Sequence, residues 1–307
     1  MKLILATLAL FPFLSMAQTH VIKLNYANDF FYATDRYFTQ GVRLEYIAPV
    51  FQFLPFKYLQ IETNEKQKRY AGIAIERNGF TPTSIRINQI PTETRPYAGT
   101  TFISHFNILL DAAKKVKVFS QIDFGIIGPA VGGKEEQTAI HKAIGDVLPL
   151  GWEYQISNDI IINYTLGLEK GIIHHKYFNA ILLTQVRAGT LYTDASLGGM
   201  LRIGLMNNYV KSLTHEENTP AIKCYGFVKA FGKMVGYNAT MQGGLFSNSI
   251  YTLPPAAIRR LVNETSIGIT VGYKNLQLEY SKFNLSHEYR NGLSHNWGQF
   301  TILYAFN

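Results

Sequence analysis

The amino-acid sequence predicts an all-β protein, an antiparallel transmembrane β-barrel of the outer-membrane type. Three observations lead to this prediction. Charged residues make up only 16% of the chain, whereas soluble proteins average about 25%. Aromatic residues are abundant, with 19 Tyr and 20 Phe. Long tracts alternate apolar and polar residues with a period of two, as expected of strands that face lipid on one side and water on the other.

Composition alone also allows a secreted β-sandwich. The cysteine count limits how either architecture can be stabilised. Cys224 is the single cysteine, so an internal disulfide cannot form, and an exported chain must be stabilised in another way. Closing a sheet into a barrel would supply that stabilisation.

Residues 1–17 predict a secretory signal peptide. They carry one positive charge at Lys2, an apolar run over residues 3–14, and a small-x-small cleavage site at residues 15–17. The apolar run is too short for a membrane-spanning helix, which needs about 20 residues. We therefore expect residues 18–307 to form one outer-membrane β-barrel domain without a transmembrane helix.

The period-two pattern also predicts the individual strands. Residues 266–284 read as a hairpin with Asn275 at its tight turn. In residues 41–46, Arg43 and Glu45 alternate with apolar residues, as a wet barrel interior requires. Because a spanning strand takes about 9–11 residues, the chain has room for roughly 10–14 strands. The other candidate strands are residues 21–26, 70–76, 100–109, 116–126, 160–168, 182–192, 197–205, 225–231 and 298–306.

Residues 134–144 interrupt this pattern and predict a short helix, which Gly145 is well placed to end. Gln137 and His141 are four residues apart, so they project from the same helix face. Histidine is the side chain most easily poised as a general base near neutral pH, and a hydrogen-bonding neighbour can fix its tautomer. The same pair on a surface helix can also be simply solvated.

A second group of polar residues lies near the start of the chain. Asp29 could ligate a hard cation such as Ca²⁺, and Asn28 could donate a hydrogen bond to a developing oxyanion. Thr39 shares the strand parity of Gly41 and Arg43, so we expect it to face the barrel lumen. Asn-Asp pairs are also common turn formers, which is the plainer explanation of residues 28 and 29.

Several familiar catalytic and binding patterns are absent from the sequence. It contains no G-x-S-x-G elbow, no HExxH helix, no EF-hand spacing, no P-loop and no dinucleotide fingerprint. His174 and His175 are adjacent, so on a strand they point to opposite faces and make a poor metal pair. No nucleic-acid partner is expected.

The order of four segments resembles the outer-membrane lipid A 3′-O-deacylase family (LpxR-like). They are NDFFYATDRYFTQGVRLEY (28–46), TRPYAG (94–99), IGPAVGGKEEQTAIHKAIG (127–145) and PLGWEYQ (149–155). The resemblance implies a barrel of twelve strands with a Ca²⁺-dependent active site inside it, near the outer leaflet. It implies hydrolysis of the ester that carries the 3′-acyloxyacyl group of lipid A.

The resemblance also implies roles for particular residues. His141 looks like the general base that activates water, and Gln137 like its active-site partner. Asp29 looks like the Ca²⁺ ligand, Asn28 lies near the oxyanion, and Thr39 falls on the family's active-site threonine. One position departs from the family pattern, which has a lysine after a proline-containing turn. Here residues 83–88, which follow Pro82, contain no lysine. Arg86 could supply the positive charge, but we do not assign it to the site.

The net charge of +8 suits a partner that carries phosphates, such as lipid A. Candidate contacts are Arg43, Arg95, Lys142 and Arg202, although each could instead balance acidic groups inside the barrel. We expect a monomer in the bacterial outer membrane that acts on lipid A of lipopolysaccharide. The alternatives are an outer-membrane phospholipase, or a porin or adhesin barrel without enzymatic activity in which Gln137 and His141 only plug the lumen.

Overall fold

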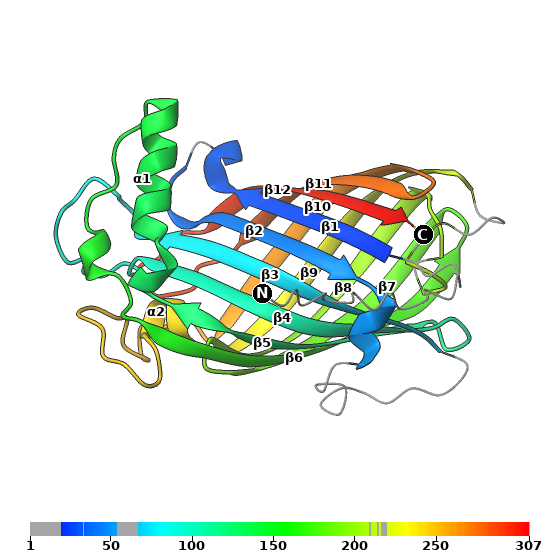
Figure 1. Ribbon diagram of the computed structural model, residues 1–307, viewed down its shortest axis with the longest axis horizontal. Coiled ribbons are helices and arrows are strands. Elements are labelled where there is room, and N and C mark those ends of the chain that lie inside the picture. The colour runs from blue at the N-terminus through cyan, green and yellow to red at the C-terminus, as the bar shows by residue number, and fades with distance from the viewer. Residues whose placement is uncertain are drawn as a thin grey trace, which may run out of the picture.

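The computed structural model describes residues 20–32, 34–53, 67–208, 210–213, 215 and 220–306. They form a closed barrel of twelve antiparallel strands, in which each strand pairs with its neighbours in sequence and β1 pairs with β12 (Figure 1). The predicted fold class is confirmed. The predicted signal peptide lies outside the described residues. Among the helices described, none combines the length and the apolar character needed to cross a bilayer.

The strands are β1 (His20–Asn28), β2 (Tyr37–Ile47), β3 (Lys68–Thr81), β4 (Ala98–Asp111), β5 (Val116–Ile127), β6 (Asp159–His175), β7 (Phe178–Gly189), β8 (Tyr192–Leu205), β9 (Ile222–Asn238), β10 (Leu261–Tyr273), β11 (Leu276–Leu285) and β12 (His295–Phe306). Each contains one predicted strand. The segment 182–192 runs too far, because β7 ends at Gly189 and β8 begins at Tyr192. A connection of two residues is too short to interrupt the apolar pattern visibly.

Short helices fill the connections. They are η1 (Asp29–Tyr32), η2 (Pro49–Phe53), η4 (Pro129–Val131), α1 (Gly133–Ile144), η5 (Trp152–Tyr154) and α2 (Ala239–Gln242). The helix predicted at residues 134–144 is therefore confirmed as α1. Gly145 ends it with a φ of 72°, a left-handed conformation that glycine adopts at little cost.

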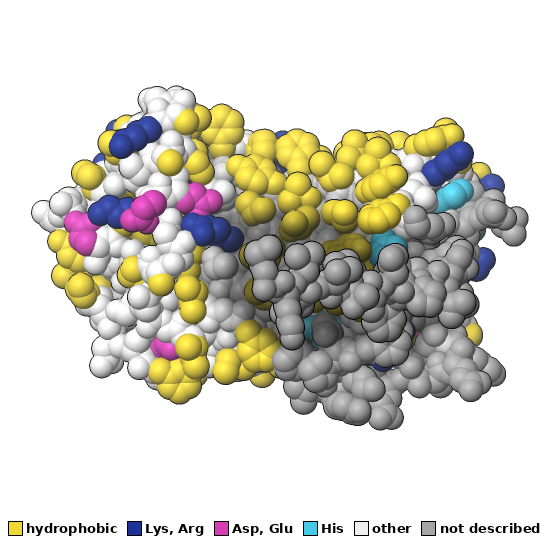
Figure 2. All heavy atoms as spheres, viewed as in Figure 1, with side chains coloured by type: hydrophobic (Ala, Val, Ile, Leu, Met, Phe, Trp, Pro, Cys, Tyr) yellow, Lys and Arg dark blue, Asp and Glu magenta, His cyan; other side chains and the backbone are white. Residues whose placement is uncertain are grey.

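The alternation along the strands separates a lipid-facing surface from the interior. On β10, Ile267 and Ile269 are exposed, whereas Ser266 and Thr270 are buried inside the barrel. Hydrophobic side chains cover the middle of the surface in Figure 2, and charged side chains gather at the end that carries α1. This pattern is typical of an outer-membrane barrel, whose apolar band is flanked by polar ends.

The two ends of the barrel differ in the length of their connections. One end has the short turns 112–115, 176–177 and 274–275, together with two longer connections, 48–67 and 206–221. The other end carries the longer segments 82–97, 128–158 and 239–260, together with η1 and α1 (Figure 1). Outer-membrane barrels keep short turns in the periplasm and long loops outside, so α1 lies at the extracellular end.

Interior arginines are paired with carboxylates. Arg43 donates from Nε to Glu45 at 2.7 Å and from Nη1 to Glu76 at 2.8 Å. Arg95 is almost fully buried and forms an ion pair with Glu288 at 3.1 Å. Both arginines balance charges inside the barrel and do not face lipid.

Candidate functional site

Helix α1 lies against the outer surface of the barrel wall. Gln40 on β2 donates from Nε2 to Glu136 Oε1 of the helix at 3.2 Å, and Arg77 on β3 forms an ion pair with the same carboxylate. Gln40 and Arg77 have the same parity as Leu44 and Ile75, which are exposed on the lipid-facing side. The candidate site beside α1 is therefore outside the barrel wall. This corrects the expectation, taken from the resemblance, of a site inside the barrel.

A cavity of about 390 Å³ lies between α1, the wall and the segment that joins β1 to β2. Every predicted site residue lines it: Asn28, Asp29, Thr39, Gln137 and His141. The remaining lining residues are Tyr26, Phe30, Phe31, Thr34, Asp35, Gln40, Ile140, Ile144 and Asp146. The fold thus brings together residues separated by more than one hundred positions in sequence.

Thr39 reaches this cavity because β2 contains an irregularity. Phe38 pairs with Phe80 and Gln40 with Gly79, so Thr39 is an extra residue in its strand. A bulge of this kind changes the side to which the following side chains point. Thr39 lines the outer cavity and donates to Gly79 O at 3.3 Å. The prediction that it faces the lumen was wrong, because it extended the parity of Gly41 across the bulge.

A chain of polar contacts connects the helix to the loops around it. Trp152 donates from Nε1 to Gln137 Oε1 at 2.8 Å, and Gln137 Nε2 donates to Asp35 Oδ1 at 2.9 Å. Asp35 Oδ2 lies 3.2 Å from His141 Nε2, and His141 Nδ1 contacts Val147 O. Because the indole can only donate, it fixes the orientation of the Gln137 amide and directs its nitrogen to Asp35.

These contacts also define the protonation of His141. A carbonyl oxygen can only accept, so Nδ1 carries a proton that it donates to Val147 O. Nε2 is then the nitrogen that can accept a proton from a reactant, and Asp35 lies beside it. The Val147 carbonyl orients the ring through Nδ1, and Asp35 can accept a hydrogen bond from Nε2 once that nitrogen carries a proton.

Two of the segments that carry the resemblance support this arrangement. The rings of Tyr97, from TRPYAG, and Trp152, from PLGWEYQ, lie 4.7 Å apart between centroids. Tyr97 also donates from its hydroxyl to Leu150 O at 2.8 Å. A Cβ atom at Gly133 would lie 2.7 Å from the Trp152 ring, so the first turn of α1 must have no side chain there. Both segments thus hold the indole that orients Gln137.

Asp35 and Trp152 were not among the predicted site residues. Asp35 lies in the same polar stretch as Asp29 and precedes the bulge at Thr39. Asp35 lies six positions after Asp29, and two acidic residues at such a distance also occur in ordinary polar loops. The sequence therefore offers no reason to select Asp35. Trp152 carried a clearer signal, since it is one of only two tryptophans in the chain.

Asn28 and Asp29 form a rigid turn at the end of β1, which we call the hook (residues 28–32 and 34–36). Asn28 Oδ1 accepts a hydrogen bond from Phe30 N at 2.7 Å, as in an Asx turn. Asp29 is almost fully buried, and its Oδ2 accepts from Thr34 Oγ1 and from Arg36 N, each at 3.0 Å. The turn-forming role considered for this pair is therefore real, and it holds both side chains at the cavity.

Burial makes the charged form of both cavity aspartates unfavourable. It raises the pKa of Asp29 to about 8, although hydrogen bonds from Arg36 and Thr34 oppose the shift. Burial also raises the pKa of Asp35, while His141 opposes that shift. Two carboxyl groups in a confined space, each short of compensating positive charge, are well suited to a cation.

The donor atoms of the cavity fit a hard cation. Asp29 Oδ2 accepts hydrogen bonds from Thr34 Oγ1 and Arg36 N. The carboxylates of Asp29 and Asp35 and the hydroxyl of Thr34 are oxygen donors of the kind that Ca²⁺ prefers. Within the described residues, no group of three or more His, Cys, Asp or Glu side chains converges. A cation here would therefore need backbone or water oxygens as well.

One part of the cavity lining is apolar. Tyr26 and Phe31 contribute from the barrel side, and Ile140 and Ile144 from α1. Ile144 is 59% exposed and Phe30 is 71% exposed. Since these side chains lie at the lipid-facing wall, the cavity offers an apolar surface continuous with the outside of the barrel.

The described lining includes no lysine or arginine. Arg86 is exposed on the loop after β3, and Lys142 is exposed on α1 away from the cavity. Of the cations considered as lipid contacts, Arg202 belongs to a cavity inside the barrel. Arg36 is the cation adjacent to Asp35 in sequence, but its guanidinium lies over the Tyr37 ring at 5.9 Å and does not line the cavity.

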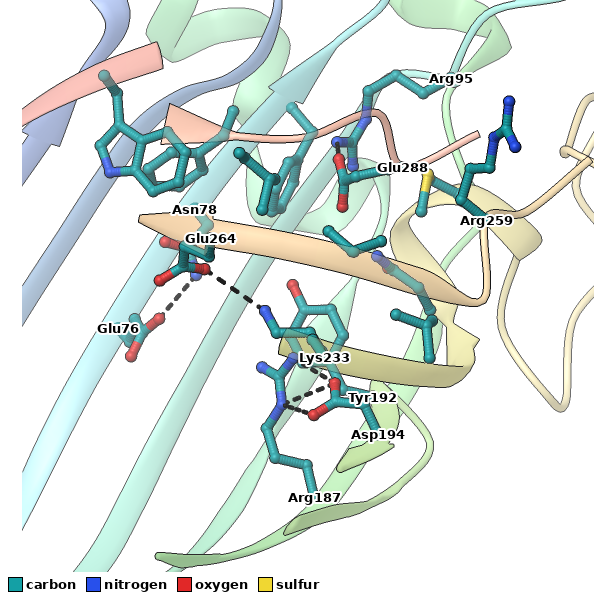
Figure 3. Close-up of a pocket in the computed structure, with 18 residues that line it drawn as sticks. Glu76, Asn78, Arg95, Arg187, Tyr192, Asp194, Lys233, Arg259, Glu264 and Glu288 are labelled. Carbon is teal, nitrogen blue, oxygen red and sulfur yellow. Dashed lines mark hydrogen bonds and ion pairs between the residues drawn. The ribbon is translucent and has the colours of Figure 1, made fainter. Parts of the chain in front are cut away.

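A second cavity, of about 320 Å³, lies inside the barrel (Figure 3). Its charged side chains largely pair with each other, as Figure 3 shows for Arg187 with Asp194 and Lys233 with Glu264. Its described lining contains no His, Ser or Cys, and its carboxylates form ion pairs with arginine or lysine side chains. The outer cavity is the stronger candidate for catalysis.

Comparison with known proteins agrees with this architecture. The family model described as outer membrane protein LpxR matches residues 3–306. The structure is similar to that of LpxR from Salmonella typhimurium, with a TM-score of 0.72 and 18% identity, covering 92% of this chain and 99% of that one. At this identity the similarity shows a common fold. No curated protein matches the sequence significantly.

Weaker similarity extends to other barrels. The β domain of the Bordetella autotransporter Brka gives a TM-score of 0.45 at 8% identity and covers 94% of this chain and 98% of that one. The KdgM porin gives 0.41 at 7% identity, with 94% and 99% covered.

Proposed function

The chain belongs to the LpxR family of outer membrane proteins, and on that basis we propose that it is a Ca²⁺-dependent lipid A 3′-O-deacylase. It would hydrolyse the ester that carries the 3′-acyloxyacyl group of lipid A. The observation that carries this proposal is the outer cavity, where a histidine, two aspartates and an apolar wall meet at the lipid-facing surface of the barrel. An ester in the outer leaflet can reach such a cavity from the side, without leaving the membrane.

His141 acts as the general base in this proposal. Nε2 takes a proton from water as the water oxygen bonds to the ester carbonyl carbon. The imidazolium is stabilised by Asp35 at 3.2 Å and held by Val147 O. When the ester C–O bond breaks, His141 returns the proton to the departing sugar oxygen, giving a free hydroxyl and a carboxylic acid. No covalent nucleophile is needed.

Asn28 is suited to stabilise the oxyanion. Its Nδ2 carries two hydrogens, and one goes to the Tyr26 hydroxyl at 3.2 Å. The second can go to the carbonyl oxygen of the ester. The hydrogen bond from Phe30 N fixes the amide before the substrate arrives, and donors fixed in this way stabilise developing charge most effectively.

Asp29 and Asp35 would hold the cation, with Thr34 as a neutral oxygen donor. A bound Ca²⁺ supplies Lewis-acid polarisation of the ester carbonyl. Hydrogen bonds from Thr34 and Arg36 hold the Asp29 carboxylate at the cavity, where it would contribute to binding the ion. The requirement for Ca²⁺ then gives a direct test.

The test is the deacylation of purified lipid A by refolded protein, followed by mass spectrometry. Loss of the 3′ acyl groups in Ca²⁺ and not in EDTA is the expected result. Intact lipid A in the presence of a folded barrel and Ca²⁺ would refute the proposal. Release of fatty acid from phosphatidylethanolamine instead would identify a phospholipase, and ion conductance without hydrolysis would identify a pore.

Introducing a charge into the apolar wall should impair substrate binding. We expect Ile144→Glu to raise KM for lipid A by about tenfold or more, because a carboxylate would be desolvated against an acyl chain. Ala143→Glu adds the same charge on the same turn at an exposed position that does not line the cavity. Steady-state kinetics in mixed micelles should show a change in the first variant only, and equal KM values would exclude an acyl chain on this wall.

The Ca²⁺ requirement should depend on pH. Burial raises the pKa of Asp29 to about 8 in the absence of a cation, so below that pH an ion must displace a proton. We expect the half-saturating Ca²⁺ concentration to rise about tenfold for each unit of pH below 8, and to be constant above it. Calcium titrations at several pH values measure this directly. A half-saturating concentration that is the same from pH 6 to pH 8 would contradict the assignment of Asp29.

A further inference from the structure

Lys282 on β11 is a charged residue on the lipid-facing surface of the barrel. It pairs with Ile267 of β10, which is exposed to lipid, and shares the parity of Leu278 and Tyr280. Across the described outward positions of β1, β2 and β9–β12, Lys282 is the only Lys, Arg, Asp or Glu. A cation on a surface that is otherwise neutral calls for a specific explanation.

Strand register places Lys282 at the height of the candidate site. Gly298 of β12 pairs with Asn28 on one side and with Lys282 on the other. Adjacent strands are about 4.8 Å apart, so the Cα atoms of Asn28 and Lys282 are separated by about 10 Å along this row. The lysine side chain can cover much of that distance.

Helix η1 connects Lys282 to the edge of the cavity. Phe31, which lines the cavity, lies over Gly298 and packs its ring edge-on against Phe300 at 5.5 Å. The next residue, Tyr32, has its ring centroid 5.7 Å from Lys282 Nζ. The aromatic surface around Lys282 resembles the belt that marks the level of lipid headgroups.

The chemistry of this position favours a phosphate. Lys282 is exposed and forms no ion pair with the carboxylates that the structure describes. An ammonium at headgroup level is a point charge suited to a phosphate group. The cavity itself has no described lysine or arginine, so this residue supplies the positive charge that an anionic lipid would find next to it.

We propose that Lys282, together with the Tyr32 ring, binds a phosphate of the lipid whose ester occupies the outer cavity. This inference rests on the proposed function, because it assigns the headgroup of the same substrate. Its consequence is selectivity: lipid A that retains its phosphates is bound better than lipid A that has lost them.

The experiment uses binding, so that it does not depend on turnover. We would measure the Kd for bisphosphorylated lipid A and the Kd for dephosphorylated lipid A. Both are measured with the folded, full-length His141→Ala protein and with the same protein carrying Lys282→Gln. We expect Lys282→Gln to weaken binding of the phosphorylated lipid five- to tenfold and to leave the other unchanged, while Lys282→Arg restores binding. The matched control is Lys274→Gln, which lies in the same hairpin at the opposite end and also contacts a tyrosine ring.

Three other binding outcomes would overturn the inference. If Lys282→Gln weakens binding of both lipids equally, Lys282 has a structural role. If the Kd for the phosphorylated lipid is unchanged, Lys282 does not contact the headgroup. Competition by millimolar inorganic phosphate as strong as that by the lipid would indicate a free-anion site. If the binding result holds but wild-type protein does not deacylate lipid A, the headgroup site stands and the proposed reaction fails.

Discussion

Replacing His141 by alanine is expected to lower kcat for lipid A deacylation by about 10²- to 10⁴-fold, the usual contribution of a positioned general base. The imidazole is buried beside the cavity, with Nδ1 held by Val147 O and Nε2 beside Asp35. No other described residue of the lining is a histidine, so the variant has no second imidazole to take its place. Single-turnover kinetics with lipid A, read by mass spectrometry, measure the loss.

The variant must be shown to fold. Heat-modifiable mobility in gels reports barrel closure, and Lys142→Ala serves as a matched control because Lys142 is the exposed neighbour on the same helix. Activity of His141→Ala within threefold of wild type, in a closed barrel, would exclude His141 as the base. Loss of activity in both variants would indicate a disturbed helix.

Asp29→Asn is expected to cause a loss of similar size, about 10²- to 10³-fold, since a metal ion supplies several kcal/mol and each 1.36 kcal/mol is a factor of ten. Asparagine keeps an oxygen that can accept from Thr34 Oγ1 and Arg36 N. The substitution therefore removes the charge and preserves the hook. Rates with saturating Ca²⁺ and with EDTA are the measurement.

EDTA should reduce wild-type activity to the level of Asp29→Asn and should have little further effect on the variant. Glu135→Gln, which removes a carboxylate from an exposed position of α1 outside the cavity, should retain the wild-type response to Ca²⁺. An Asp29→Asn protein that responds to Ca²⁺ like wild type would place the ion elsewhere.

Most of the fold could be predicted from the sequence because alternate residues of a barrel strand face lipid and the barrel interior, and their polarity follows that alternation. The hairpin at residues 266–284 is an example, since lipid on one side and a polar interior on the other leave little freedom at each position. The helix at residues 134–144 was equally clear, because its residues break that alternation. Several strands are longer than predicted, such as β6 (Asp159–His175) for residues 160–168 and β9 (Ile222–Asn238) for residues 225–231, and the predicted segment 182–192 ran past Gly189.

The site was less predictable because its geometry depends on pairing between distant segments. The extra residue at Thr39 is recognised only when Phe80 and Gly79 are set opposite it. The position of α1 outside the wall follows from Gln40 and Arg77, polar residues on an outward face. Charged or amide side chains on the described outward face therefore point to a contact that the sequence alone does not reveal, as Gln40 and Arg77 do for α1.

The contact between η1 and β12 has a consequence for biogenesis. Asn28 and Asp29 are held by a hook whose Phe31 rests on Gly298 and Phe300, residues of the strand that is synthesised last. The first and last strands meet only when the barrel seals. The aromatic contact between η1 and β12 therefore forms only in a sealed barrel, and a partly folded chain holds Asn28 and Asp29 through their local hydrogen bonds alone.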